Sequence, residues 1–213
     1  MMATDNVENL DAGYIMGKNI VNLHDFKGNR ALDIGCGYAS HTVAYADVFN
    51  EVDAIDVETS MSRDYLRTLS PSADKITFIH EDIHNFLIIP DRYDLIYSLS
   101  ALEHINNWQT IVTDIPKRLT KGGLFNLIIS PLYYSPTGHH LYPMIGDWEH
   151  ILLPEDELKE KFFKKEGPQW AWDIYLELNR LTASEFLILA KTFFETVYLE
   201  VNIKTIHYVG RRK

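Results

Sequence analysis

Short apolar segments alternate with helical segments between residues 30 and 129, and this alternation restricts the possible folds more than any other feature. Strands are predicted at residues 30–34, 52–57, 75–80, 93–99 and 124–129. Helices are predicted between most of them. Successive strand–helix–strand units place their strands parallel in one sheet. The sequence therefore predicts a doubly wound α/β fold, with helices on both faces of a mostly parallel sheet.

The C-terminal part of the chain departs from this pattern. Two further strands are predicted at residues 196–201 and 205–209, on either side of Asn202. Strands this close in sequence must be antiparallel neighbours, because a parallel crossover needs about a dozen residues or more. Together with the five earlier strands, they predict a seven-stranded sheet with an antiparallel C-terminal strand.

Local signals place several helices. The first thirty residues are predicted to form helical pieces, and Thr59 or Ser60 is predicted to cap the helix that follows the second strand. Asn107 is predicted to cap another helix, which the glycine pair at 122–123 would end. The segment 182–185 (Thr-Ala-Ser-Glu) is a capping box that opens a further helix.

Charge and composition indicate in which cell compartment the protein works and which classes of partner it is expected not to bind. The 213 residues carry a net charge of −10 and a single cysteine, Cys36, and no run of eighteen apolar residues occurs. The first residues lack the basic and apolar regions of a signal peptide. We expect one cytoplasmic domain spanning residues 1–213 with no membrane partner. We also expect no nucleic-acid partner, because an acidic chain repels a phosphate backbone.

A glycine-containing turn follows the first predicted strand. Residues 33–37 read Asp-Ile-Gly-Cys-Gly, and a helix is predicted after them. Glycines here let the backbone turn sharply and approach a ligand closely. The start of the following helix offers free N–H groups to an anion. Alone, such a turn also occurs as a plain connection between a strand and a helix.

Two aspartates at the ends of the next strands strengthen the prediction of a binding site. Asp56 ends the second strand, where a carboxylate can accept hydrogen bonds from ribose hydroxyls. Asp82 follows the third strand, where it can bind an adenine amino group, and Ile83 can cover the ring. Each aspartate alone is more simply a helix cap or an exposed turn. All three features fall at one edge of the sheet, and this favours a shared adenosine site.

Residues 31–130 resemble the cofactor-binding core of class I S-adenosylmethionine-dependent methyltransferases of the small-molecule type. The segment 33–37 resembles the first motif of that family. Residues 93–98 with 102–105 resemble the fourth-strand motif and the turn after it, and residues 119–124 resemble the Gly-Gly turn before the fifth strand. The C-terminal strand pair is similar to the antiparallel seventh strand of the family.

The resemblance implies a Rossmann-like fold, methyltransferase activity and S-adenosylmethionine as the cofactor. It implies that the cofactor-binding residues are Asp33, Gly35, Cys36, Gly37, Asp56, Val57, Asp82, Ile83 and Ser98. One position departs from the pattern, because Ala39 stands where the family often has glycine. A methyl group there shifts how closely the backbone can meet the cofactor.

A nucleotide-binding dehydrogenase is the main competing hypothesis. Such enzymes have glycine three residues after the second glycine of the turn, and this chain has Ser40. The antiparallel strand pair at the C-terminus also disfavours a dehydrogenase.

The segment from 130 to 181 is the largest insertion after a predicted strand, and we expect it to form a lid over the acceptor. It is rich in aromatic residues and histidines: Tyr133, Tyr134, His139, His140, Tyr142, Trp148, His150, Trp170, Trp172 and Tyr175. Such a segment can line an apolar pocket for a small organic acceptor. The simpler alternative is a lid that packs on itself.

The tandem His139 and His140 is the first candidate for a general base, because an oxygen acceptor benefits from proton removal. Adjacent side chains point in different directions, so only one is expected to face the acceptor. Surface or hydrogen-bonding histidines are the alternative. Glu103 and His104, after the fourth strand, are the second candidate pair, and structural roles are the alternative for them.

No metal is expected. His139, His140, Glu149 and His150 could supply ligands, but their spacing matches no compact metal motif.

The sequence therefore predicts methyl transfer to a small molecule. A hydroxyl of a sugar or secondary metabolite is the first choice of acceptor, with a histidine as base. N-methylation of a small amine is the alternative reaction. A module that binds S-adenosylmethionine without catalysis is the alternative from another class.

Overall fold

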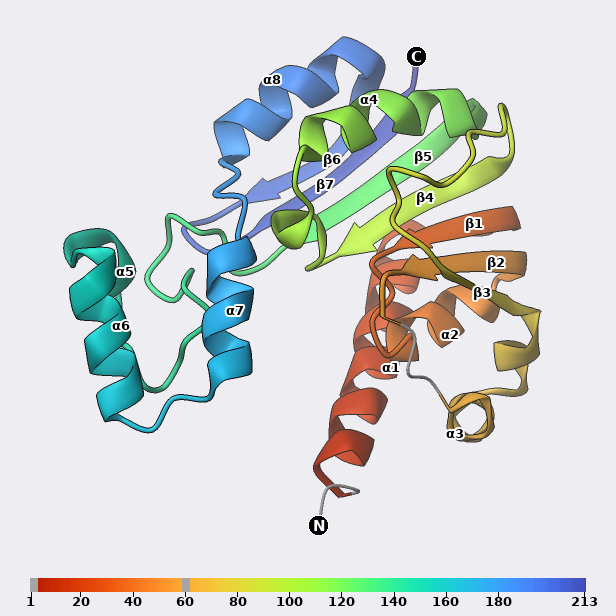
Figure 1. The fold of residues 1–213 in the computed structure, drawn as a ribbon. Coiled ribbons are helices and arrows are strands. Elements are labelled where there is room, and N and C mark those ends of the chain that lie inside the picture. Colours follow the sequence, from red (N-terminus) through yellow and green to blue (C-terminus); the bar gives the residue numbers. More distant parts are fainter. Residues whose placement is uncertain (1–3, 59–61) are drawn as a thin grey trace.

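The computed structural model of the protein describes residues 4–58 and 62–213, and for residues 4–10 the backbone alone. A seven-stranded sheet crosses the molecule in the order β3-β2-β1-β4-β5-β7-β6 (Figure 1). The strands are β1 (Gly28–Ile34), β2 (Phe49–Asp56), β3 (Ile76–His80), β4 (Tyr93–Leu99), β5 (Leu119–Ile129), β6 (Phe194–Val201) and β7 (Ile206–Arg212). Neighbouring strands are parallel except at β5–β7 and β6–β7. The predicted mostly parallel α/β fold with an antiparallel C-terminal strand is confirmed.

Helices cover both faces of this sheet. They are α1 (Thr4–His24), α2 (Ser40–Ala46), α3 (Arg63–Leu69), α4 (Trp108–Arg118), α5 (Glu149–Leu152), α6 (Glu155–Lys164), α7 (Gln169–Glu177) and α8 (Ala183–Phe193), with short 3-10 turns η1 (Pro71–Lys75) and η2 (Leu102–His104). α4 and α8 lie on one face, and α1 and α2 on the other (Figure 1). Along β4, Leu95 and Tyr97 belong to the core on the α1–α2 side, and Ile96 belongs to the core on the α4–α8 side. This alternation follows from the two-residue repeat of a strand.

The N-terminal region forms one helix of 21 residues, α1, where sequence analysis predicts helical pieces. Two glycines let this helix approach the start of α2. A Cβ atom at Gly13 would lie 2.1 Å from the Ser40 Oγ, and one at Gly17 would lie 2.7 Å from the backbone oxygen of His41. Because α2 follows the glycine turn directly, this close packing supports the turn from behind.

Replacing Gly17 with alanine is expected to destabilise the protein. Alanine favours a helix over glycine by about 1 kcal/mol, but the added methyl group would collide with the backbone at His41. Overpacking of this kind costs about 1–3 kcal/mol, so we expect a net loss of about 1 kcal/mol in the free energy of unfolding. Urea denaturation measures it.

Asn19→Ala is the matched control, because Asn19 is exposed on the same helix. This control is expected to leave stability unchanged or slightly raised. A Gly17→Ala protein as stable as the Asn19→Ala protein would contradict the close packing of α1 on α2.

The predicted end of α4 is wrong. The helix ends at Arg118, and residues 122–123 lie inside β5 rather than after the helix. Pro116 weakens the last helical turn because it has no N–H to donate. Leu119 then pairs with Tyr93, and Gly122 adopts a φ of 77° where the register between β4 and β5 shifts. The glycines therefore allow the irregular backbone within β5 and do not end the helix.

The predicted helix caps have different outcomes. The Thr182 capping box is confirmed, since its side chain and that of Glu185 each accept a hydrogen bond from the other's backbone N–H. Asn107 precedes α4 as predicted, but its side chain makes no capping hydrogen bond. α3 is capped by the Ser62 side chain. The predicted capping residues Thr59 and Ser60 lie outside the described residues.

The segment 130–181 carries α5, α6 and α7 beyond the carboxyl ends of β4 and β5 (Figure 1). It has its own apolar cluster, which contains Tyr133, Leu141, Ile145, Leu158, Phe162, Ala171, Trp172, Tyr175 and Leu178. Its C-terminal end is fixed to η2, because the Asn179 side chain donates hydrogen bonds to the backbone oxygens of Leu102 and Ile105. Among the described residues, no helix has the length and apolarity needed to cross a membrane.

Candidate cofactor and acceptor site

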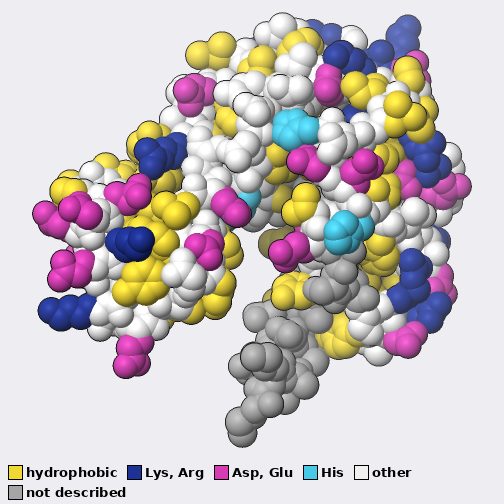
Figure 2. All heavy atoms as spheres, in the orientation of Figure 1, with side chains coloured by type: hydrophobic (Ala, Val, Ile, Leu, Met, Phe, Trp, Pro, Cys, Tyr) yellow, Lys and Arg dark blue, Asp and Glu magenta, His cyan; other side chains and the backbone are white. Residues whose placement is uncertain are grey.

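A cleft of about 710 Å³ opens at the carboxyl ends of β1 to β4. Its lining consists of Ile34, Gly35, Gly37, Ile55, Asp56, Val57, Glu81, Asp82, Ile83, His84, Ser100, Ala101, His104, Ile105, Asn106, Asn107 and Glu177. The strand order reverses direction between β1 and β4, and open α/β sheets bind ligands at such a point. In Figure 2 the molecule is hollowed between the insertion and the half that carries β1 to β3.

The glycine turn forms one wall of this cleft. Gly35 and Gly37 have φ values of 75° and 49°, which favour glycine. A Cβ atom at Gly35 would lie 2.3 Å from the Cβ of Ala101, so the turn packs closely against the residues after β4. A Cβ atom at Gly37 would meet nothing within 4 Å, because that position faces open space. Ala39 also adopts a left-handed φ, of 52°, just before α2.

The two strand-end aspartates face the same cleft, as their positions in the sequence predict. The Asp56 carboxylate accepts hydrogen bonds from the backbone N–H groups of Gly37 (2.8 Å) and Glu58 (2.9 Å). Asp56 therefore ties the glycine turn to the end of β2. Asp82 accepts from the backbone N–H of His84 at 2.8 Å. Each carboxylate oxygen can accept a second hydrogen bond.

Three of the predicted cofactor residues do not line the cleft but lie buried beneath it: Asp33, Cys36 and Ser98. The Thr42 hydroxyl donates to Asp33 at 2.6 Å, and His41 Nε2 lies 3.0 Å from the same carboxylate oxygen. Burial raises the pKa of the Cys36 thiol well above its usual range, so this thiol is neutral. These buried residues pack beneath the glycine turn and support its conformation.

Several lining residues of the cleft were not predicted from the sequence. Ser100 and Ala101 follow β4 directly, in the same way that Val57 follows β2, and this position was the available signal. Glu177 had no such signal, because it reaches the cleft from the far end of α7.

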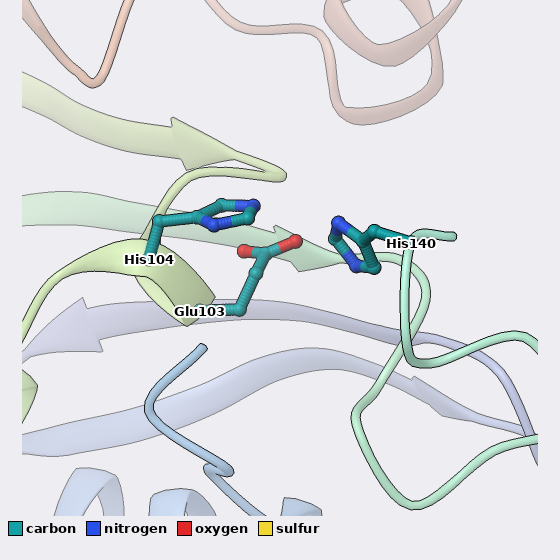
Figure 3. Close-up of side chains that lie close together, drawn as sticks. All are labelled: Glu103, His104 and His140. Carbon is teal, nitrogen blue, oxygen red and sulfur yellow. The ribbon is translucent and has the colours of Figure 1, made fainter. Parts of the chain in front are cut away.

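Glu103, His104 and His140 form a cluster beside this cleft (Figure 3). Glu103 and His104 belong to η2, and His140 belongs to the loop after β5. One ligand atom from each side chain lies within 4.8 Å of the others, and the two imidazole centroids are 5.1 Å apart. Figure 3 shows the Glu103 carboxylate directed toward the His140 ring. The structure therefore joins residues from both of the predicted catalytic pairs.

A second pocket of about 420 Å³ adjoins the cleft. It is lined by His104, His140, Trp170, Ala171, Ile174 and Glu177. His104 and Glu177 line both cavities. The pocket therefore has an aromatic and aliphatic wall from α7, and His104 is one of the residues that join it to the cleft.

His139 lies elsewhere. It is fully buried, and its Nδ1 accepts a hydrogen bond from the backbone N–H of Leu141 at 2.8 Å. Its ring lies 5.0 Å from that of His150. Glu149 accepts from the backbone N–H of Gly146 and pairs with Lys161. The four residues considered as metal ligands in the sequence therefore form no common cluster among the described residues.

Comparison with known proteins finds a family match for part of the chain. The model of the methyltransferase domain family (Methyltransf_11) matches residues 32–127, which hold the glycine turn, both strand-end aspartates, Glu103 and His104. Residues 32–127 therefore form a domain of this methyltransferase family. No curated protein matches the sequence of the chain.

Solved structures share the fold of this chain. A Listeria monocytogenes protein described as an S-adenosylmethionine-dependent methyltransferase aligns with a TM-score of 0.64 and 17% identity, over 95% of this chain and 98% of that one. A Haloferax volcanii methyltransferase, solved with its activator protein, aligns at 0.60 and 14%, over 95% and 97%. The N-methyltransferase NodS of Bradyrhizobium japonicum, bound to S-adenosylhomocysteine, aligns at 0.56 and 13%, over 92% and 84%.

The lining of the cleft suits S-adenosylmethionine. Open space at Gly37 leaves room for a ligand against the backbone. Four carboxylates line the cleft, from Asp56, Glu81, Asp82 and Glu177, and no lysine or arginine is among its described lining residues. Such a lining favours a cationic ligand, and the cofactor carries a sulfonium.

Burial governs the charges of the cluster of Glu103, His104 and His140. Burial raises the pKa of Glu103 to about 8. Burial, followed by repulsion from His140, lowers the pKa of His104 to about 4. Burial also lowers the pKa of His140. In the absence of a further ligand, both imidazoles are therefore neutral at pH 7, and each keeps a nitrogen lone pair.

Proposed function

We propose that this chain is a class I S-adenosylmethionine-dependent methyltransferase that methylates a hydroxyl oxygen of a small organic acceptor, such as a sugar or a secondary metabolite. The observation that supports this most is that the cofactor cleft and the second pocket share His104 and Glu177. A donor in the cleft and an acceptor in the pocket would be neighbours. Methyl transfer depends chiefly on such proximity and alignment.

The cofactor is assigned to the cleft by its polar groups. Asp56 would hold the ribose hydroxyls, and Asp82 the adenine amino group, with Ile83 against the ring. The turn at Gly35 and Gly37 would lie against the methionine part. Val57 would line the adenosine side of the cleft.

The segment 130–181 is proposed as the acceptor lid of a single domain spanning residues 1–213. Its helix α7 contributes Trp170, Ala171 and Ile174 to the pocket. Trp170 is 66% exposed, although it belongs to a pocket wall. An acceptor stacked on this ring would cover it, and the apolar wall fits an organic molecule of modest size.

The proposed reaction needs an activated hydroxyl. An oxygen lone pair forms the new bond to the methyl carbon, and the carbon–sulfur bond breaks with its electron pair on sulfur. The products are a methyl ether and S-adenosylhomocysteine, and the hydroxyl proton is released. S-adenosylmethionine supplies the electrophilic methyl group, and the chain must orient the oxygen and help to remove its proton.

His140, with Glu103 and His104, is proposed to activate the hydroxyl. His104 lines both cavities, His140 lines the second pocket and Glu103 lies close to both histidines, whereas His139 is hydrogen-bonded within the insertion. The histidine role predicted for the tandem is therefore assigned to its second member. N-methylation of a small amine is the second candidate, because Glu177 in the pocket wall would attract an ammonium group, which must lose a proton before its nitrogen lone pair can attack the methyl carbon.

A product assay tests the proposed function. The protein is incubated with S-adenosylmethionine carrying a labelled methyl group and with panels of small hydroxyl and amine compounds of matched size. The expected product is a methyl ether, identified by mass spectrometry and NMR. Methylation confined to amines would overturn the assignment to oxygen, and no labelled product from either panel would overturn the small-molecule acceptor.

A further inference from the structure

We propose that Glu103, His104 and His140 bind a divalent transition-metal ion, with its open coordination positions toward the acceptor pocket. The three side chains come from two segments that follow neighbouring strands, β4 and β5. Their candidate ligand atoms lie within 4.8 Å of one another. Ligands around one ion stand about 3–3.5 Å apart, given bonds of about 2.0–2.2 Å, so small side-chain rotations complete the site.

Unsatisfied polar atoms give independent support for a bound ion. Both carboxylate oxygens of Glu103 and the Nε2 of His140 are buried and make no hydrogen bond of good geometry with a described residue, although the backbone groups of Glu103 and Ser130 lie near the carboxylate. The Glu103 side chain is only 4% exposed, and it forms no ion pair with a described residue. Burial of such groups without partners is costly. A cation between them would satisfy the carboxylate and the imidazole together.

The donor set selects the class of metal. Two imidazole nitrogens and one carboxylate suit Zn²⁺, Co²⁺, Fe²⁺, Mn²⁺ or Ni²⁺, whereas Mg²⁺ and Ca²⁺ prefer sites made of oxygen atoms. Three protein ligands leave at least one coordination position for another molecule. His104 and His140 both line the acceptor pocket, so the free position is available to an acceptor oxygen.

A metal at this place would perform the activation assigned above to the cluster. A hydroxyl bound to a divalent ion is a stronger acid, so its proton leaves to solvent more readily while a second oxygen lone pair attacks the methyl carbon. No electron is gained or lost by the ion. His140 then acts as a ligand, because its nitrogen lone pair is bound to the metal. This catalytic role rests on the proposed function, but the binding of the ion does not.

Metal titration of the full chain tests the site directly. The protein is stripped with a chelator and titrated with Co²⁺, whose visible absorption reports nitrogen and oxygen coordination, and then with Zn²⁺ in competition. We expect one ion per chain. Glu103→Gln and His140→Ala are each expected to weaken binding by about 100-fold or more, since a direct ligand outweighs the 10–100-fold effect of its supporting residues.

His139→Gln is the matched control, because glutamine keeps an acceptor for the Leu141 N–H and His139 lies outside the cluster. Circular dichroism and thermal melting check that all variants fold. Full binding by His139→Gln supports the site. Absence of stoichiometric binding to the wild-type chain, or equal binding by all folded variants, would overturn it.

Methylation assays then separate the metal site from the proposed function. Loss of methylation after chelation, with recovery on adding Zn²⁺ or Co²⁺, supports the catalytic role of the ion. Stoichiometric binding with methylation unchanged after chelation would overturn that role. If no hydroxyl compound is methylated under any condition, the proposed function fails, and the titration still decides the metal site.

Discussion

Replacing Asp56 with alanine is expected to weaken the binding of S-adenosylmethionine by about 100-fold. A hydrogen bond to a charged group contributes about 1.5–3 kcal/mol, and two bonds from ribose hydroxyls would be lost. The variant also frees the N–H of Gly37, which Asp56 holds at 2.8 Å, so the glycine turn loses its link to β2. Isothermal titration calorimetry with S-adenosylmethionine and S-adenosylhomocysteine measures the effect.

Two further variants distinguish the hydrogen bonds that Asp56 accepts from the effect of negative charge near the cleft. Glu58→Ala removes a neighbouring carboxylate but keeps the backbone N–H that donates a hydrogen bond to Asp56. This variant is expected to change the affinity for S-adenosylmethionine by less than about threefold, because exposed charges have small effects. Asp56→Asn keeps one acceptor oxygen, so its affinity for S-adenosylmethionine should lie between those of Asp56→Ala and Glu58→Ala. An affinity for Asp56→Ala equal to that of the wild type would refute the ribose assignment.

The second large effect is expected at the cluster beside the acceptor pocket. His140→Ala and Glu103→Gln should each lower kcat by about 100-fold or more, in line with the loss of proton removal from an acceptor. Neither residue lines the cofactor cleft, so the affinity for S-adenosylhomocysteine should stay within about twofold of the wild type. Steady-state kinetics with an identified acceptor, together with calorimetry, gives both quantities.

The tandem histidines supply the comparison for this prediction. His139→Gln removes the imidazole that lies beside His150, away from the pocket lining. We expect it to retain most of the activity. If His139→Gln loses as much turnover as His140→Ala while binding cofactor normally, the assignment of activity to His140 alone is wrong.

Much of the fold could be predicted because its signals are local. The apolar strands between residues 30 and 129 and the short connection at Asn202 are enough to predict parallel units followed by an antiparallel pair. The errors occur where tertiary contacts override a local signal. The glycines at 122–123 are typical of a helix end, yet they lie in β5 because pairing with β4 begins at Leu119. α1 is continuous across Gly13 and Gly17 because packing on α2 favours glycine there.

Some residues of the candidate site could likewise be predicted from the sequence, and others could not. Gly35, Gly37, Asp56 and Asp82 could be placed together from the sequence, because each follows a strand and parallel strands end at one edge of the sheet. The carboxylate of Glu177 could not, since its place in the cleft depends on how α7 packs.

The sequence by itself determined the α/β alternation, the turn at 33–37 and the strand-end aspartates, because each depends on residues close together in the chain. Only the tertiary structure decided which histidine of the tandem joins Glu103 and His104. β4 and β5 pair in parallel, so the segments after them meet at one edge of the sheet. The left-handed backbone at His140, with a φ of 58°, and the hydrogen bond that fixes His139 then direct the two rings to different places.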